Sequence, residues 1–242
     1  MLRRYVLTLT GIPENRLKYE LAVKIHGYLN HVISGEDASR FHAYGESRPY
    51  SMFLTRQKGK TLLVINTLNE QAACIPEALS RNETISIDGL RDPVIVQSIK
   101  KVQEETLETL EKGKNTDIIT LHFFSPVTYR KNNRFCCRFD LSRISGNPLA
   151  KLKAYEGIDI PKANFYQWED SVRFQAYHLR SYRYRVTKEG INSFLGRITL
   201  NLEDCPETLK TQFHLALRYA RYTGAGSKTT LGMGGMDIVN AL

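Results

Sequence analysis

The chain has 242 residues, enough for one large domain or for two domains of roughly 120 residues each. With 42% hydrophobic and 24% charged residues it has the composition of an ordinary folded protein, which excludes long disorder and coiled coil. The formal net charge of +9 indicates a polyanionic partner. No run of about 18 apolar residues could span a membrane, and the first residues lack the apolar stretch of a signal peptide. We therefore expect a cytoplasmic protein with no membrane partner.

The four cysteines show no metal-binding spacing. Cys136 and Cys137 are adjacent in a predicted strand, where successive side chains point to opposite faces. Neither a CxxC pair nor an HExxH motif is present. We expect reduced thiols that fill a core, and a chemistry that uses neither a metal nor another cofactor.

The first half of the chain alternates strands and helices in the order β-α-β-β-α-β. The alternation of apolar and polar residues predicts the strands, and apolar residues at a spacing of three to four predict the helices. In chain order the elements are a strand over 4–10, a helix from about 15 to 32, strands over 51–57 and 60–68, a helix over 70–81 and a strand over 93–102. This is the ferredoxin-like order.

The charged stretch 104–116 is the predicted boundary between two domains, 1–112 and 117–242. After it the strand and helix content of the first half repeats. The elements are strands over 118–124 and 134–139, a helix over 149–155, strands over 172–186 and 196–202, a helix over 207–222 and a last strand over 236–239. The sequence therefore predicts an α+β protein of two tandem ferredoxin-like (RRM-like) βαββαβ domains with a C-terminal glycine-rich loop.

Positive charge and aromatic residues gather in the second half. Residues 171–188 hold five cations, four aromatic residues and no acid, and residues 208–236 also lack Asp and Glu. A solvated basic face is one explanation. Cations that alternate with stackable rings favour a single-stranded nucleic acid instead. The candidate RNA-binding residues in these stretches are Arg180, Arg183, Arg185 and Arg221.

The segment 223–235 is a loop with five glycines. Glycines allow a backbone to approach a bulky partner closely, and exposed amides with Lys228, Thr229 and Thr230 would suit phosphate oxygens. A nucleotide-binding P-loop is excluded on two grounds. Ser227 stands where that motif needs a glycine, and the loop follows a helix instead of a strand.

This loop has the form GxGxxxxxGxG and lies between the last helix and the last strand of a second ferredoxin-like unit. It resembles the repeat-associated (RAMP) superfamily of CRISPR proteins, and within it the endoribonucleases that process CRISPR repeats. The residues that carry the pattern are Gly224, Gly226, Gly232 and Gly234, which we also take as RNA-binding candidates.

The resemblance implies an endoribonuclease that cuts precursor crRNA without a metal. The 2′-hydroxyl attacks the neighbouring phosphate and leaves a 2′,3′-cyclic phosphate and a 5′-hydroxyl end. The implied partner is CRISPR repeat RNA or precursor crRNA. Other CRISPR effector subunits are possible further partners. The oligomeric state, monomer or homodimer, stays open.

His42 lies in the segment 40–51, which resembles the histidine segment of this family. Histidine suits either proton-transfer role because its ordinary pKa lies near ~6.5. Arg48 stands where the family often has a lysine, and it keeps the charge but cannot donate a proton, so we expect it to contact phosphate. An exposed loop histidine is the alternative reading of His42.

Members of this family also carry a tyrosine on the first helix, and in this chain the resemblance places Asn30 at that position. Tyr28 and His31 lie three residues apart on one side of that helix. Either is a candidate partner for His42, although Tyr28 lies at the edge of the apolar stripe and can serve packing.

Two other functions are open. The first is a non-catalytic RAMP-type subunit that holds crRNA in an effector complex. The second is a general binder of single-stranded RNA, which is disfavoured because no RNP1 string occurs in the chain. Cleavage of repeat RNA in the presence of EDTA would separate the enzyme from the non-catalytic subunit.

Overall fold

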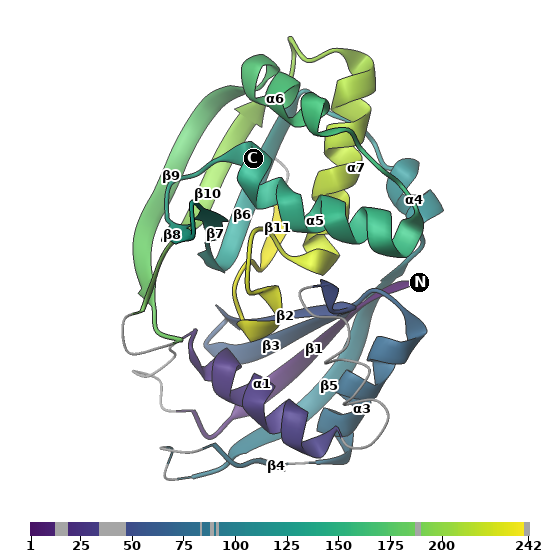
Figure 1. Ribbon diagram of the computed structural model, residues 1–242. Helices are drawn as coiled ribbons and strands as arrows, with labels where there is room; N and C mark the ends of the chain where they lie inside the picture. Colours follow the sequence, from purple (N-terminus) through teal and green to yellow (C-terminus); the bar gives the residue numbers. More distant parts are fainter. Residues whose placement is uncertain are drawn as a thin grey trace.

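The computed structural model describes residues 1–12, 19–33, 47–82, 84–87, 90, 92–186 and 190–239. His42 therefore lies outside the described residues. The described chain confirms the predicted α+β class, with two large antiparallel sheets that each carry helices on one face, and a small two-stranded hairpin (Figure 1). Within these ranges no helix combines the length and the apolar content needed to cross a membrane.

The first sheet has the strand order β2-β3-β1-β5-β4. Its strands are β1 (Leu2–Thr10), β2 (Tyr50–Gln57), β3 (Lys60–Thr67), β4 (Thr84–Ile85) and β5 (Val94–Glu105), and its helices are α1 (Leu21–Val32), the short η3 (Glu70–Ala73) and α3 (Cys74–Arg81). Alternation places Leu7 and Leu9 of β1 on the face that packs against Ile25 and Leu29 of α1. The four long strands follow the ferredoxin-like arrangement, and β4 is an added edge strand.

The second sheet has the order β11-β6-β10-β9, which is the same arrangement with the last strand beside the first. This half of the chain comprises α4 (Leu107–Glu111), β6 (Ile118–Val127), β7 (Tyr129–Lys131), β8 (Arg134–Cys136), α5 (Leu141–Glu156), α6 (Lys162–Ser171), β9 (Arg173–Tyr184), β10 (Ile191–Asn201), α7 (Glu207–Thr223), η4 (Thr229–Leu231) and β11 (Met236–Val239), and β7 and β8 pair with each other as a separate hairpin. Helices α5, α6 and α7 lie over one face, and β9 follows the outer edge (Figure 1). Trp168 and Phe213 are fully buried in this core.

The predicted elements differ from the structure in several places, of which four matter most for the second half. The helix predicted over 149–155 begins at Leu141, because Asp140 caps it by accepting from the amide of Arg143 at 3.0 Å, and it continues through Pro148. The strand predicted over 134–139 is the short β8, which pairs only with β7. Helix α6 was not predicted. The strand predicted over 172–186 ends at Tyr184.

The two halves of the chain share packing. Ser51 on β2 donates to the carbonyl of Tyr222 at the end of α7 at 2.7 Å, and the rings of Phe53 and Phe124 stack with centroids 6.1 Å apart. Leu2 and Leu68 of the first half belong to the core of the second half. The first sheet ends with β5 at residue 105, and the second begins with β6 at residue 118. The predicted domain boundary at 112–117 lies in this interval and stays a prediction.

Candidate functional site

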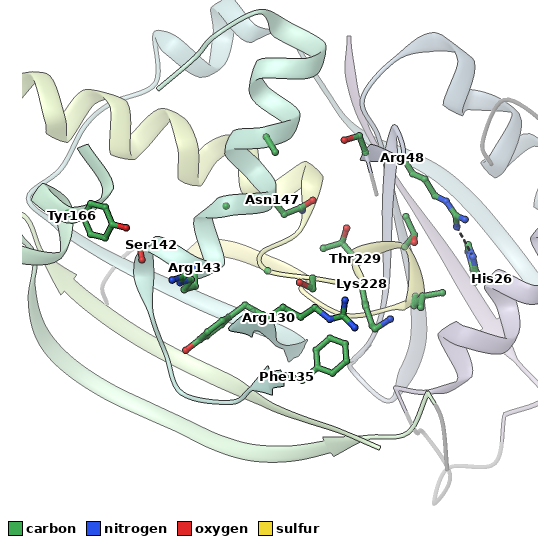
Figure 2. A pocket seen from close by; sticks show the side chains of 18 residues that line it. His26, Arg48, Arg130, Phe135, Ser142, Arg143, Asn147, Tyr166, Lys228 and Thr229 are labelled. Atoms are coloured by element: carbon green, nitrogen blue, oxygen red, sulfur yellow. Dashed lines mark hydrogen bonds between the residues drawn. The ribbon is translucent and has the colours of Figure 1, made fainter. Parts of the chain in front are cut away.

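A cavity of about 760 Å³ lies between the two halves of the chain (Figure 2). His26, Ser47 and Arg48 line it from the first half, and the β7–β8 hairpin, α5, Tyr166 and the glycine-rich loop line it from the second. Its described lining has four permanent cations, Arg48, Arg130, Arg143 and Lys228, and no carboxylate. A lining of this kind attracts a polyanion. No group of three His, Cys, Asp or Glu side chains that could hold a metal occurs among the described residues.

His26 and Arg48 meet at one end of this cavity, with Tyr166 at the other (Figure 2). His26 is 6% exposed, and its Nε2 lies 2.9 Å from Nη1 of Arg48. Its Nδ1 lies 3.0 Å from the hydroxyl oxygen of Tyr50, the first residue of β2. Burial raises the pKa of Tyr50 to about 12, so this phenol keeps its proton.

These contacts determine which nitrogen of His26 carries the proton. A guanidinium nitrogen only donates, so Nε2 of His26 must accept from Arg48. The ring is then the neutral tautomer with its proton on Nδ1, and Nδ1 donates to Tyr50. The Nε of Arg48 is buried without a hydrogen-bond partner among the described residues. An unpaired buried donor costs free energy, which an anion could recover by drawing the guanidinium toward the cavity.

Helix α5 of the second half holds the segment that carries Arg48. The hydroxyl of Tyr155 donates to the carbonyl of Ser47, and Nζ of Lys151 donates to the carbonyl of Tyr50 at 3.3 Å. Lys151 is 1% exposed, and desolvation by burial lowers its pKa to about 7. The residues on both sides of Arg48 are therefore fixed by the other half of the chain.

An aromatic ring of the cavity wall, Phe135, lies close to two cations. The guanidinium of Arg130 lies 5.1 Å from the ring centroid of Phe135, and the ammonium of Lys228 lies 5.4 Å from it. Lys228 has φ +61°, a left-handed conformation that costs an L residue about 1 kcal/mol. The strained residue is thus the one whose ammonium group lines the cavity.

The glycine-rich loop packs closely against protein. A Cβ on Gly232 would lie 2.2 Å from the Cβ of Ala22 on α1, and a Cβ on Gly226 would lie 2.2 Å from the carbonyl oxygen of Thr128. Gly224 and Gly234 are also buried. The group that closely approaches these glycines is therefore protein. For Gly232 this group is helix α1 of the first half.

The backbone amides of this loop are mostly used inside the protein. The amide of Gly226 donates to Ile144, that of Ser227 to Thr128 and that of Gly234 to Pro126, each at 2.8 Å. The expectation that these amides are exposed for phosphate is wrong. Lys228, Thr229 and Thr230 do line the cavity, as does the backbone at Gly226, and their contact with RNA stays a prediction.

The two predicted partners on α1 do not line the cavity. At 100° per residue, Tyr28 and His31 lie 160° and 140° from His26 around the helix. Tyr28 donates to the carbonyl of Thr84 at 3.2 Å and packs against the first core, and His31 is exposed. His26 lines the cavity but was not among the predicted site residues. The sequence indicates only that it lies beside Ile25, at the edge of the apolar stripe of the helix.

The four predicted RNA-binding arginines lie outside the cavity lining. Arg180, Arg183 and Arg185 are exposed along β9 and just beyond its end. Arg183 lies within β9, whereas Arg185 follows its last residue, Tyr184. The alternation of side chains along the strand therefore does not place the two arginines on one face. Arg221 is half-buried and pairs with Asp237 at 2.6 Å. Arg221 therefore has a partner within the protein.

Two ferredoxin-like units in tandem make up the fold, and solved structures of Cas6 and RAMP proteins share it. Residues 121–236 match the family model described as CRISPR-associated endoribonuclease Cas6. The CRISPR-associated endoribonuclease Cas6 of Streptococcus thermophilus is 24% identical over 233 residues, which cover 90% of this chain and 91% of that protein. The predicted resemblance to the CRISPR repeat-processing endoribonucleases is confirmed.

Solved structures share this fold over their full length. The product complex of Cas6 (TTHA0078) superposes with a TM-score of 0.81 at 21% identity, covering 99% of each chain. The Thermus thermophilus Cas6 (TTHB231) has a TM-score of 0.73 at 22% identity, covering 99% of this chain and 98% of that one. A RAMP protein that binds different RNA substrates has a TM-score of 0.63 at 16% identity, covering 98% of this chain and all of that one.

Proposed function

We propose that this protein binds CRISPR repeat RNA and cleaves precursor crRNA as a metal-independent endoribonuclease. The 2′-hydroxyl of the nucleotide before the scissile phosphate attacks that phosphate, and the products carry a 2′,3′-cyclic phosphate and a 5′-hydroxyl. The observation that carries this proposal is the contact of 2.9 Å between His26 Nε2 and Arg48 Nη1 in the wall of a cation-lined cavity.

This contact joins the two kinds of group that the reaction needs. The attacking 2′-hydroxyl must lose a proton, and the phosphorane must be stabilised by positive charge. His26 has its proton on Nδ1, so its Nε2 offers a lone pair to a hydroxyl once Arg48 moves away. A phosphate in the cavity gives Arg48 a charged acceptor that a guanidinium can bind through two parallel hydrogen bonds, whereas His26 offers a single neutral nitrogen.

The order of events follows from this exchange. In the free protein Arg48 occupies the lone pair of His26. On binding, the phosphate draws Arg48 away, and His26 becomes the base for the 2′-hydroxyl. His42 then protonates the leaving 5′-oxygen, in keeping with its place in the segment that resembles the histidine segment of the family. Arg130, Arg143 and Lys228 hold the neighbouring phosphates.

The substrate class rests on the comparisons together with the charge of the cavity. The relative from Streptococcus thermophilus is a CRISPR-associated endoribonuclease, and the solved structures with this fold include product and substrate mimic complexes of Cas6 (TTHA0078). The described lining of the cavity has cations and hydroxyl groups but no carboxylate, which is the side-chain group through which proteins usually hold a magnesium ion.

The test uses repeat RNA in two forms, in buffer that contains EDTA. The unmodified RNA should be cut at one site, and RNA with a 2′-deoxy nucleotide before that site should bind but stay intact. Cleavage of the deoxy substrate would contradict attack by the 2′-hydroxyl, and activity that disappears with EDTA would contradict metal independence. Tight binding with no cleavage of either RNA would favour the non-catalytic crRNA-binding subunit.

A further inference from the structure

A second, smaller pocket of about 280 Å³ adjoins the cavity and has no role in the reaction proposed above. Tyr129, which is 5% exposed, lines both spaces. The second pocket lies between the β7–β8 hairpin, the start of α5 and the first residues of β9. A strand of RNA in the large cavity can therefore place its next nucleotide at this pocket.

An exposed aromatic ring forms one wall of the pocket. Phe174, the second residue of β9, is 60% exposed. This ring packs edge-to-face with the buried Phe139, with centroids 5.7 Å apart and planes at 86°. This packing holds the ring in place, and most of its surface stays open to solvent. A large exposed ring that lines a pocket is a platform on which a nucleobase can stack.

The charged residues of the pocket favour a neutral base inside it and the phosphate of the same nucleotide at its rim. Asp140 and Glu169 line it, and each accepts from the first turn of α5: Asp140 from the amide of Arg143 at 3.0 Å and Glu169 from the amide of Ser142 at 3.2 Å. These carboxylates disfavour a phosphate within the pocket. Lys131 and Arg138, which are exposed, also line it and can hold a phosphate at its rim.

We propose that this pocket binds one unpaired nucleobase of the RNA, stacked on Phe174, with the phosphate of the same nucleotide between Lys131 and Arg138. The inference rests on the proposed function, because the large cavity must hold the RNA. The pocket is just below the volumes of about 300–1,000 Å³ that are typical of sites for drug-sized ligands. It accordingly takes a single base.

The experiment measures the affinity for repeat RNA with a 2′-deoxy nucleotide at the cleavage site, so that binding is observed without cleavage. Phe174→Ala should weaken binding on the order of tenfold, and Phe174→Tyr should stay within threefold of wild type. Phe174→Leu keeps an apolar contact to Phe139 and should bind as weakly as the alanine variant. Tyr177→Ala is the matched control, because Tyr177 is 54% exposed on the same strand and does not line the pocket.

A set of RNAs with one abasic nucleotide each identifies the bound base. At one position, loss of the base should weaken wild-type binding and leave no further effect of Phe174→Ala, as a double-mutant cycle requires for two groups in contact. Equal losses from Phe174→Ala and Tyr177→Ala, or additive effects at every position, would overturn the pocket proposal alone. Wild-type protein that binds no RNA would overturn both proposals.

Discussion

The guanidinium of Arg4 on β1 lies 2.7 Å from the carboxylate of Asp237 on β11, so an ion pair joins the first and the last strand of the chain. Asp237 also accepts from Arg221 at 2.6 Å, and Arg4 donates to the carbonyl of Arg221 at 2.6 Å. The side chains of Arg4 and Asp237 are 10% and 20% exposed. One carboxylate thus balances two arginines between the sheets.

Asp237→Asn should destabilise the protein by about 2 kcal/mol, because it removes the counter-charge of the buried Arg4 and leaves Arg221 only the longer pair of 3.9 Å with Glu105. Urea unfolding measures the change. Glu108→Gln is the control, since the pair between Glu108 and Lys112 is more than 70% exposed on both sides and should give no measurable change. Equal stabilities of the two variants would mean that the Asp237 contacts do not hold the halves together.

Lys151 should make stability depend on pH. Its pKa is lowered to about 7 in the folded protein by burial, whereas in the unfolded chain it is near ~10.4. Between these values the unfolded state binds more protons, so the stability contributed at this site rises with pH, by at most about 1.4 kcal/mol per unit. Below pH 7 the full cost of burying the charge remains.

Lys151→Met should therefore be most stabilising, relative to wild type, at pH 7 and below. Its advantage should shrink steadily as the pH is raised toward 10. Urea unfolding of both proteins at pH 6, 7, 8, 9 and 10 gives this difference. A difference that stays constant over the series would show that Lys151 is protonated in the folded protein throughout.

His26→Ala should lower the rate of RNA cleavage by ~10²-fold or more, with the affinity for 2′-deoxy repeat RNA within a few-fold of wild type. Single-turnover cleavage separates the rate from binding. His42→Ala should lower the rate by a similar factor. A loss of activity in His31→Ala with none in His26→Ala would reverse the assignment on α1.

Gly232→Ala should destabilise the protein by about 1–3 kcal/mol, because φ is +92° and the new Cβ would collide with Ala22. Thermal unfolding measures the effect. Gly27→Ala on α1 is the matched control, because nothing lies within 4 Å of its Cβ position, and it should stabilise by about 0.5–1 kcal/mol. A neutral Gly232→Ala would mean that the loop does not hold the first half at this distance.

Lys228→Ala should weaken RNA binding and reduce the slope of log affinity against log salt by about one unit or less. Affinity measured over a series of salt concentrations gives the slope. Lys112→Ala and Lys114→Ala, in the stretch between the sheets, should leave it unchanged. The same loss from all three lysines would indicate general charge attraction in place of a specific contact.

The fold could be predicted because its signals are local. The alternation in β1 and the apolar spacing in α7 are each contained within one element. Helix α6 has no comparable stripe, and it depends on the buried Trp168, whose Nε1 donates to the carbonyl of Leu209 at 3.1 Å. A contact across 41 residues leaves no periodic signal in the sequence.

The site could be predicted only in part, for the same reason. Arg48 was identified from the segment in which it lies, and Lys228 from its loop. The contact of Arg48 with His26 depends on how β2 packs against α1, which spacing along the chain does not specify. The glycines of the loop indicated a close neighbour correctly, but whether that neighbour is RNA or protein depends on the docking of the two halves.

The glycine-rich loop and α5 together set the distance between His26 and the cations of the second half. Arg48 and Lys228 come from different halves of the chain, so the cavity is a gap whose width depends on how the sheets dock. A protein or RNA that binds far from the cavity and widens this gap by an ångström would reduce cleavage without touching a reacting group. If the proposed cleavage takes place in this cavity, its rate depends on how closely the two halves of the chain pack.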